Sequence, residues 1–291
     1  MDILIIGNPV AGRGRTLDRI HEFVRILEAL GHNVETFLTS RAGDGAERAR
    51  VIGPDIDRLV IAGGDGTVNE VLNGLLDPSR VPILHLPTGT ANQLAFHLGL
   101  PTKPRLLAKV LTEGAIRRLD MGTVNDHRFL LQVSAGFDAL VTEVIHRSRK
   151  KTLGYRGYVW PVCKALARRS SAHVEILVDG QTRFTGSTVM IMKVRNYGRF
   201  FVFAKAARLD SGHFDVCVFR DGKIPSLFLY AFAGLLRQAG KVPGITHATG
   251  RRIRMESPGP VPVQVDGTYF GTTPVDLDLL PAYVPVVIPA T

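Results

Sequence analysis

Cysteine, tryptophan and long apolar runs are all scarce in this sequence of 291 residues. The two cysteines, Cys163 and Cys217, stand in apolar stretches without metal-type spacing, so we expect buried thiols in a reducing compartment. The longest apolar stretch, residues 226–236, is too short to span a bilayer. No basic segment followed by an apolar one marks a signal peptide at the N-terminus. These shortages exclude a disulfide-stapled scaffold and a helical membrane protein, and they favour a cytoplasmic location.

Acidic residues are also scarce in one part of the chain. The formal net charge is +10, and residues 128–254 hold 22 Lys and Arg against 7 Asp and Glu, a net of +15. Such a surface suits a polyanion, either an anionic membrane face or nucleic acid, although a solvated surface explains any single basic cluster. No nucleic-acid-binding motif accompanies the charge, so we expect a peripheral association with the inner membrane face and no nucleic-acid partner.

The pattern of apolar residues predicts two domains. Up to residue 118, strands near 2–6, 33–38, 58–62 and 82–86 alternate with helices near 16–30, 44–52, 67–76, 92–98 and 104–113. This alternation predicts a Rossmann-like α/β domain that binds a nucleotide. Residues 119–291 predict a mainly antiparallel β-sandwich with flanking helices, whose last residues can pack back on the first domain. Its expected strands are 119–124, 128–133, 172–178, 183–195, 200–203, 213–219, 252–256, 261–266, 275–279 and 284–288, and its expected helices are 138–149, 155–169 and 225–239.

The most informative segment reads GGDGTVNE, from Gly63 to Glu70, and follows the apolar strand 59–62. Glycines allow backbone N–H groups to approach a ligand, and the helix expected to begin at Thr67 favours an anion at its N-terminus. Asp65 would repel that anion, so we expect a divalent cation or a proton between Asp65 and a phosphate. The alternative is a tight turn with an exposed Asp65.

Two further loops join a strand to a helix. Residues 7–14 read GNPVAGRG, a spacing that imitates a P-loop but has Arg13 and Gly14 where Lys and Ser or Thr are required. Arg13 can still supply charge to a phosphate. Residues 87–92 read PTGTAN and follow the strand near 82–86. Because parallel strands end at one edge of a sheet, we expect the three loops to meet there and bind a ligand.

These motifs together resemble the soluble diacylglycerol kinase-like lipid kinases, which include the sphingosine and ceramide kinases. The resemblance covers nearly the whole chain. It rests on Asn8-Pro9-x-x-Gly12-x-Gly14, on residues 63–70, on Pro87-x-Gly89-Thr90-x-Asn92, and on weaker matches at residues 134–138, Lys151-x-x-Gly154-x-x-Gly157-Tyr158, Asn196, residues 209–212 and Val265-Asp266-Gly267.

The resemblance implies an ATP-binding N-terminal domain, a β-sandwich that admits the lipid, and Mg²⁺-dependent transfer of the γ-phosphoryl group to a lipid hydroxyl. The expected partners are a lipid alcohol and an anionic membrane surface, with a homodimer left open. By this analogy Asp65 is catalytic and holds the metal, and Asp266 is a second catalytic carboxylate. The implied nucleotide contacts are Asn8, Pro9, Gly12, Arg13, Gly14, Thr39, Gly64, Asp65, Gly66, Thr67, Asn69, Glu70, Gly89 and Thr90.

Three residues depart from the family pattern. Gln93 and Thr268 stand where the family has carboxylates, one in the Mg²⁺–water network and one favoured as the base, and Ser211 stands where an Asp ligates a structural metal. Asp266 or Asp65 could substitute as the base, although Asp266 also fits a plain hairpin turn. Glu70 has an alternative role as well, because it could form a capping box with Thr67.

Three hypotheses therefore stand. The first is an ATP- and Mg²⁺-dependent lipid kinase. The second is a catalytically impaired relative that binds nucleotide or lipid, which the three departures motivate. The third is a kinase of a soluble substrate, similar to NAD kinase, which shares the glycine-rich loop but fits the other two loops less well.

Overall fold

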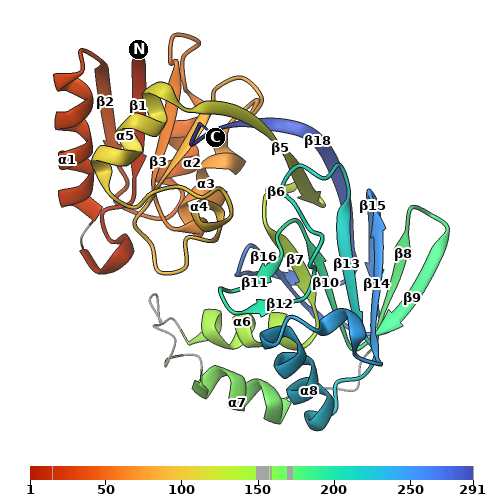
Figure 1. Cartoon of the computed structure of the whole chain (residues 1–291). Coiled ribbons are helices and arrows are strands. Elements are labelled where there is room, and N and C mark those ends of the chain that lie inside the picture. Colours follow the sequence, from red (N-terminus) through yellow and green to blue (C-terminus); the bar gives the residue numbers. More distant parts are fainter. Residues whose placement is uncertain (15, 149–156, 158, 169–172, 291) are drawn as a thin grey trace. The chain divides into compact units, whose positions relative to one another are not determined.

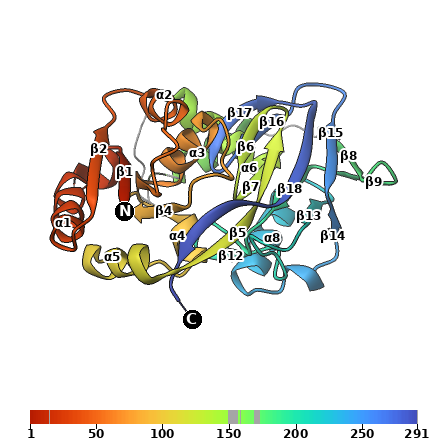
Figure 2. The same ribbon diagram turned by 90° about the horizontal axis from the view of Figure 1, so that it is seen from above.

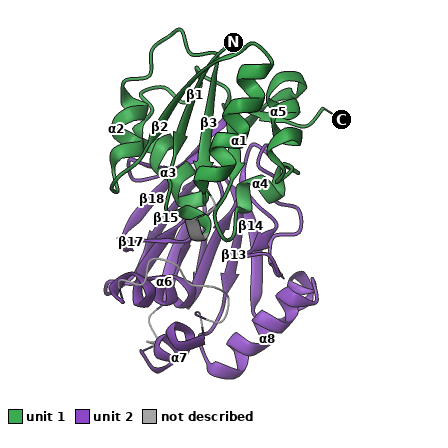
Figure 3. Ribbon diagram, turned by 90° about the vertical axis from the view of Figure 1, so that its left-hand side faces the viewer, with its two compact units in different colours: residues 1–121, 282–291 green, residues 122–281 purple. Residues whose placement is uncertain are grey.

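The computed structural model describes residues 1–14, 16–148, 157, 159–168 and 173–290, and its contacts divide the chain into two units. Unit 1 consists of Met1–Met121 and Ala282–Thr291, and unit 2 consists of Gly122–Pro281 (Figure 3). Unit 1 is an α/β domain and unit 2 is an antiparallel β-sandwich with flanking helices, so the predicted fold class is confirmed. The chain leaves unit 1 within one strand, β5 (Ala115–Val124).

A parallel sheet with the order β2-β1-β3-β4 forms the centre of unit 1, and the end of β18 lies parallel to β4, pairing Val286 with Ile83 (Figure 1). Strands β1 and β3 are almost entirely buried, because helices cover both faces of the sheet. Helix α1 packs with α5 and α2 with α3, and the two pairs lie on opposite faces (Figures 2 and 3). The elements are β1 (Asp2–Gly7), η1 (Ala11–Gly14), α1 (Thr16–Ala29), β2 (Asn33–Leu38), α2 (Asp44–Arg50), β3 (Arg58–Gly63), α3 (Asp65–Gly74), β4 (Ile83–Pro87), α4 (Gln93–His97) and α5 (Pro104–Glu113).

Two antiparallel sheets enclose the main core of unit 2. One has the order β14-β13-β10-β7-β16-β17, and the other contains β9, β8, β15 and the first part of β18, with β5 and β6 beside it. Residues from both sheets, such as Val216 and Ile253, belong to one buried cluster. Helices α6, α7 and α8 lie at the same end of the sandwich (Figures 1 and 3). The elements are β6 (His127–Phe129), β7 (Gln132–Ala135), α6 (Phe137–Arg147), α7 (Val159–Arg168), β8 (Val174–Val178), β9 (Thr182–Gly186), β10 (Thr188–Met192), β11 (Asn196–Tyr197), β12 (Phe201–Val202), β13 (Phe214–Phe219), α8 (Ile224–Leu235), η3 (Ala239–Lys241), β14 (Ile245–Gly250), β15 (Arg252–Glu256), β16 (Pro262–Val265), β17 (Thr268–Thr272) and β18 (Val275–Ile288).

Several elements differ from the sequence-based expectations. Strands β14 and β17 lie where the apolar pattern predicts none, residues 183–195 form two strands, and β18 is one strand in place of two. Helix α3 begins at Asp65 and not at Thr67. Cys163 is exposed, so the expectation of two buried thiols is wrong for this residue, whereas burial of Cys217 raises its thiol pKa. Within the described part of the chain, no helix combines the length and apolarity needed to cross a membrane.

Candidate active site

The three glycine-containing loops meet at the carboxyl edge of the unit 1 sheet. A Cβ atom on Gly12 would lie 1.7 Å from the carbonyl oxygen of Thr88, so the first loop touches the backbone of the third. A Cβ atom on Gly89 would lie 2.5 Å from the Cα of Gly64, so the second and third loops are also in backbone contact. The N–H groups of Thr88 and Gly89 both donate to the carbonyl of Gly63, at 2.9 and 3.2 Å. Loop-to-loop packing therefore explains why residues 12 and 89 are glycines.

Gly66 is different from the other glycines of this cluster. Apart from its two chain neighbours and the nearby backbone of α3, no described atom lies within 4 Å of the position that a Cβ on Gly66 would take, and the residue is exposed. Gly63, by contrast, would bring a Cβ within 2.4 Å of the Thr67 hydroxyl oxygen. Packing does not require a glycine at residue 66, and its open surface leaves room for a ligand beside the first turn of α3.

Asp65 connects the second loop to the third. Its carboxylate accepts hydrogen bonds from the backbone N–H groups of Gln93 at 2.9 Å and Leu94 at 3.0 Å, the first two residues of α4. The residue at the N-cap position of α4, Asn92, makes no side-chain cap bond of its own. Asp65 thus supplies the cap, and each carboxylate oxygen keeps a further lone pair that could face a cation.

Unpaired polar atoms gather around the third loop. Five buried side-chain atoms in residues 85–93 have no hydrogen-bond partner among the described residues. They are Nδ1 of His85, Oγ1 of Thr88, Oδ1 of Asn92, and both Oε1 and Nε2 of Gln93. Buried polar atoms are rarely left unpaired in native proteins, and such a group is typical of a site that binds water or a ligand. Together with Asp65, these atoms fit a nucleotide with an oxygen-coordinated cation.

Two residues that the sequence analysis did not single out hold this loop in place. Nε2 of His85 lies 3.0 Å from the carbonyl oxygen of Gly63, below the glycine-rich turn. Burial lowers the pKa of His85, although the negative charge of Asp65 opposes that change. Arg19 of α1 donates to the carbonyl oxygens of Pro87 and Thr102, and burial lowers its pKa. A histidine within a buried strand and an arginine on a helix give no local signal of these roles.

Glu70 contacts a different helix from the one predicted. Its Oε1 accepts from the backbone N–H groups of Gly43 at 3.0 Å and Gly45 at 2.9 Å, at the start of α2. The alternative of a capping box between Glu70 and Thr67 is therefore wrong. Thr67 instead accepts a hydrogen bond of 3.5 Å from the side-chain amide of Asn8, which joins the first loop to the second. Glu70 anchors α2 to α3 and so fixes the helix that follows the glycine-rich loop.

The other predicted nucleotide contacts are distributed around the same edge. The N–H of Thr39 donates to the carbonyl of Gly7 at 2.9 Å, and Thr90 is exposed. Asn69 lies within α3 and accepts from the side chain of Asn73. The side chain of Arg13 lies outside the part of the chain that the structure describes, as does most of the predicted 151–158 motif.

In unit 2, Asp266 lies at the β16–β17 turn in the left-handed conformation, with φ 47°. Its carboxylate accepts three backbone hydrogen bonds, from Leu130 at 3.2 Å, Leu131 at 3.0 Å and Gln132 at 2.9 Å. These bonds tie the turn to the segment between β6 and β7. Asp266 therefore has a structural role, and its catalytic role stays a prediction. Thr268, two residues further along the chain, is exposed.

A second polar group lies close to this turn. The Ser134 hydroxyl donates to Asp138 at 2.5 Å, and the side-chain amide of Gln264 donates to Ser134 at 2.9 Å. Burial raises the pKa of Asp138 to about 6, against the opposing effect of the Ser134 hydrogen bond. Gln264 also accepts from the N–H of Gly267 at 2.7 Å. The segment 134–138, matched only weakly by sequence, thus supports the turn that carries Asp266.

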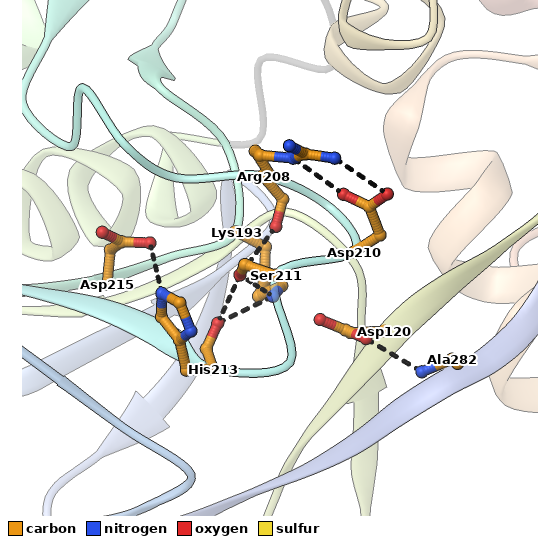
Figure 4. A network of polar contacts seen from close by, with 8 residues as sticks. All are labelled: Asp120, Lys193, Arg208, Asp210, Ser211, His213, Asp215 and Ala282. Carbon is orange, nitrogen blue, oxygen red and sulfur yellow. Dashed lines mark hydrogen bonds and ion pairs between the residues drawn. The ribbon is translucent and has the colours of Figure 1, made fainter.

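Ser211, where the family pattern has a metal-binding Asp, contacts a lysine. Nζ of Lys193 donates to Oγ of Ser211 at 2.8 Å and to the carbonyl oxygen of His213 at 2.7 Å (Figure 4). Lys193 is fully buried. Across the described residues, no three His, Cys, Asp or Glu side chains group together to hold a metal ion. The residues at this position do not fit a divalent cation.

Comparison with known proteins gives matches over the whole chain. The diacylglycerol kinase catalytic domain matches residues 2–146, and the YegS C-terminal NAD kinase beta sandwich-like domain matches residues 131–288. Proteins named diacylglycerol kinase from Staphylococcus carnosus and Bacillus subtilis are each 28% identical to the chain; the matches cover 98% of it and 94% and 95% of those proteins. A crystal structure of a diacylglycerol kinase from Bacillus anthracis has a TM-score of 0.77 at 23% identity, and the match covers 99% of this chain and 96% of that one.

Proposed function

The chain belongs to the diacylglycerol kinase-like family, with that family's catalytic domain followed by its β-sandwich domain, and from this membership we propose that it is an ATP- and Mg²⁺-dependent lipid kinase. The substrate would be a diacylglycerol-like or sphingoid alcohol. The observation that carries the proposal is the cluster of unpaired buried polar atoms at the meeting point of the three loops. A bound nucleotide would supply partners for those atoms.

The proposed reaction moves one phosphoryl group. The oxygen of the lipid hydroxyl attacks the γ-phosphorus of ATP, the bond from that phosphorus to the bridging oxygen breaks, and ADP leaves. The hydroxyl proton passes to a carboxylate, for which Asp65 and Asp266 are the predicted acceptors. Such transfer depends mainly on positioning and on neutralising charge, and a bound Mg²⁺ would supply that neutralisation.

The loops of unit 1 would position the phosphates. The exposed surface at Gly66 and the first turn of α3 favour an anion, and the spare lone pairs of Asp65 favour the cation that accompanies it. The Gln93 amide oxygen is a weaker ligand than the carboxylate of the family pattern. We therefore expect Mg²⁺ affinity to be lower here than in a chain with Asp at this position.

A catalytically impaired nucleotide-binding protein is the second candidate, favoured by one observation. The Asp266 carboxylate already accepts three backbone N–H groups, and the neighbouring position that usually carries the base is Thr268. A general base contributes about 10²–10⁴-fold to rate, so a chain without one would transfer phosphate slowly.

The test is transfer of labelled γ-phosphate from ATP with Mg²⁺ to a panel of lipid alcohols, with NAD as the soluble acceptor. Transfer to a lipid supports the proposal, and transfer to NAD alone replaces it with the soluble-substrate kinase. ATP binding without transfer, in the wild type and in the variant carrying both Gln93→Asp and Thr268→Glu, supports the impaired relative.

We also propose that the protein works at an anionic membrane surface, in keeping with the net charge of +15 in residues 128–254. Binding to vesicles that contain phosphatidylglycerol should then weaken as salt rises, because exposed charges are screened. Binding that is unchanged between low and high ionic strength would contradict this part of the proposal.

A further inference from the structure

Helix α8 exposes most of its large apolar side chains, and its buried residues are Tyr230 and two small residues. Phe228 is 65% exposed and Phe232 59% exposed, whereas Ala233 and Gly234 are buried. Gly234 lies against an aromatic ring, because a Cβ there would lie 2.7 Å from Phe203. This is the reverse of a water-facing amphipathic helix, which buries its large apolar residues.

The exposed apolar residues form one continuous surface. They recur at helical spacing along one side of α8 and its C-terminal end, and no charged residue interrupts the helix sequence IPSLFLYAFAGL. The exposed members are Ile224, Phe228, Leu229, Phe232, Leu235 and Leu236. An apolar surface of this kind marks an interaction site.

Basic residues stand at both ends of the helix. Lys223 is its N-cap and Arg237 follows its last turn, with Arg220 and Lys241 a few residues beyond. Asp221 stands among them and accepts from the N–H of Lys223. Long cationic side chains beside an apolar surface reach lipid headgroups while the apolar residues enter the acyl region. Two copies of α8 placed face to face would bring these like charges together, so charge favours an anionic bilayer over a second copy.

We propose that α8 docks the protein on the membrane by lying flat at the boundary between headgroups and acyl chains. This docking role rests on the proposed function, because the proposed substrate is a lipid alcohol that lies in the bilayer. The helix has 12 residues and is too short to span a bilayer.

The test is sedimentation with vesicles of phosphatidylcholine and phosphatidylglycerol in equal parts. The variant with Phe228→Ser and Phe232→Ser should lower the partition coefficient at least about tenfold, because two aromatic side chains no longer enter the bilayer. The control variant, Val51→Ser with Leu76→Ser, removes two apolar residues of unit 1 that are 69% and 77% exposed. It should bind as the wild type does.

Equal binding by the Phe228 and Phe232 variant and the wild type would overturn the docking role. So would a wild-type dimer that the variant converts to a monomer without a change in vesicle binding, because α8 would then be a subunit interface. Phosphoryl transfer to a short-chain, water-soluble diacylglycerol and to a water-soluble sphingoid alcohol is measured separately. Its absence, combined with vesicle binding through α8, would reject the proposed kinase activity and leave the docking helix standing.

A second inference concerns the buried ammonium of Lys193, which lies just after β10 in unit 2. It donates to a hydroxyl and to a backbone carbonyl, at distances typical of ammonium hydrogen bonds and longer than Mg²⁺–oxygen or Ca²⁺–oxygen bonds, and its charge also acts on the carboxylate of Asp215. The Ser211 hydroxyl also lies 3.1 Å from the carbonyl oxygen of Arg208, so the lysine closes the turn 208–213. A divalent cation placed beside this ammonium would be repelled.

We infer that the Lys193 ammonium holds the turn 208–213 in this chain, in place of the divalent cation bound at the corresponding family position. The positive charge is carried covalently, so unit 2 needs no metal to hold the turn. The metal requirement of the protein then belongs to nucleotide binding alone.

The test combines metal analysis with thermal unfolding in the absence of nucleotide. Protein purified without chelator should carry no stoichiometric divalent metal, and EDTA should leave its Tm unchanged. One tightly bound equivalent that persists in Asp65→Asn, and whose removal lowers Tm, would overturn the inference. The converse variant, Lys193→Ala with Ser211→Asp, should gain stability from millimolar Mg²⁺ or Ca²⁺, with the unfolding constant falling about tenfold at ten times Kd. Its control, Lys193→Ala with Ser211→Asn, should gain less.

Discussion

Asp65→Asn separates the structural and catalytic roles of Asp65. The carboxylate accepts two backbone N–H groups at 2.9 and 3.0 Å, one on each oxygen. Asparagine can accept with one oxygen only, so one charge-assisted bond is lost and the other becomes neutral. We expect a loss of about 1.5 kcal/mol in unfolding free energy, which lowers Tm by about 5 °C.

The expected loss of activity is much larger. Removing the acid that we propose steers the cation should lower the rate of phosphoryl transfer by about 10³-fold, equivalent to about 4 kcal/mol in the barrier. Unfolding cannot account for this loss, because a domain with about 5 kcal/mol or more of stability stays folded at 25 °C after losing 1.5 kcal/mol. The assay is the initial rate of transfer to the accepted lipid at saturating ATP, with Tm measured on the same samples.

The matched control is Asp179→Asn in unit 2. Asp179 also accepts two backbone N–H groups, from Arg251 and Arg252 at 2.8 Å each, but both bonds end on the same carboxylate oxygen. Asparagine can keep both bonds and tolerates the φ of 50°, so this control removes the charge of a capping carboxylate outside the candidate site. The control should retain the wild-type rate. A transfer rate of Asp65→Asn within threefold of the wild type would refute the role assigned to Asp65, and so would equal losses in both variants.

Three further changes test other parts of the structure. Glu70→Ala should lower the unfolding free energy by about 2 kcal/mol in urea denaturation, whereas Glu70→Gln should retain the bond to Gly43 and most of the stability. Gly12→Ala should weaken ATP binding about tenfold in calorimetry, because its Cβ would collide with Thr88 at a φ of +61°. Burial raises the pKa of Asp138 to about 6 in the folded protein, so folding favours the protonated carboxyl. As the pH rises from 4 to 6, the wild type should therefore lose up to about 3 kcal/mol of unfolding free energy. Above pH 6 this group should cause no further loss. Asp138→Asn should lack this loss, and parallel pH profiles in urea would contradict the assignment.

The fold of unit 1 could be predicted because its signals are local. Buried parallel strands such as β1 and β3 are continuous apolar runs, and the helices between them have clear periodicity. Unit 2 was harder to predict because some of its strands carry no local signal. Strand β14 is largely exposed and β17 has no fully buried residue, so their pairing with β13 and β16 depends on long-range contacts that no apolar pattern records.

In the candidate site, too, local features could be predicted and long-range contacts could not. The three loops and their glycines could be found from sequence, but the hydrogen-bond partners of their acidic residues could not. Asp65 bonds to Gln93, 28 residues away, and Glu70 bonds to Gly43, 27 residues away. A local capping box was the nearest explanation for Glu70 and it was wrong. One signal was present. Gly43 stands at the N-cap position of α2 and has no side chain to accept from the first N–H groups of that helix, so an acceptor from elsewhere is needed.

Strand β18 determines when the sheet of unit 1 can be completed during synthesis of the chain. Its end pairs with β4, and the N–H of Ala282 donates to Asp120 at 2.8 Å, so unit 1 includes residues from both sides of unit 2 in the sequence. On the ribosome, unit 1 cannot complete its sheet until all of the β-sandwich has been synthesised. The edge of β4 stays open during that interval, and a nascent chain with such an edge is a natural client for a chaperone.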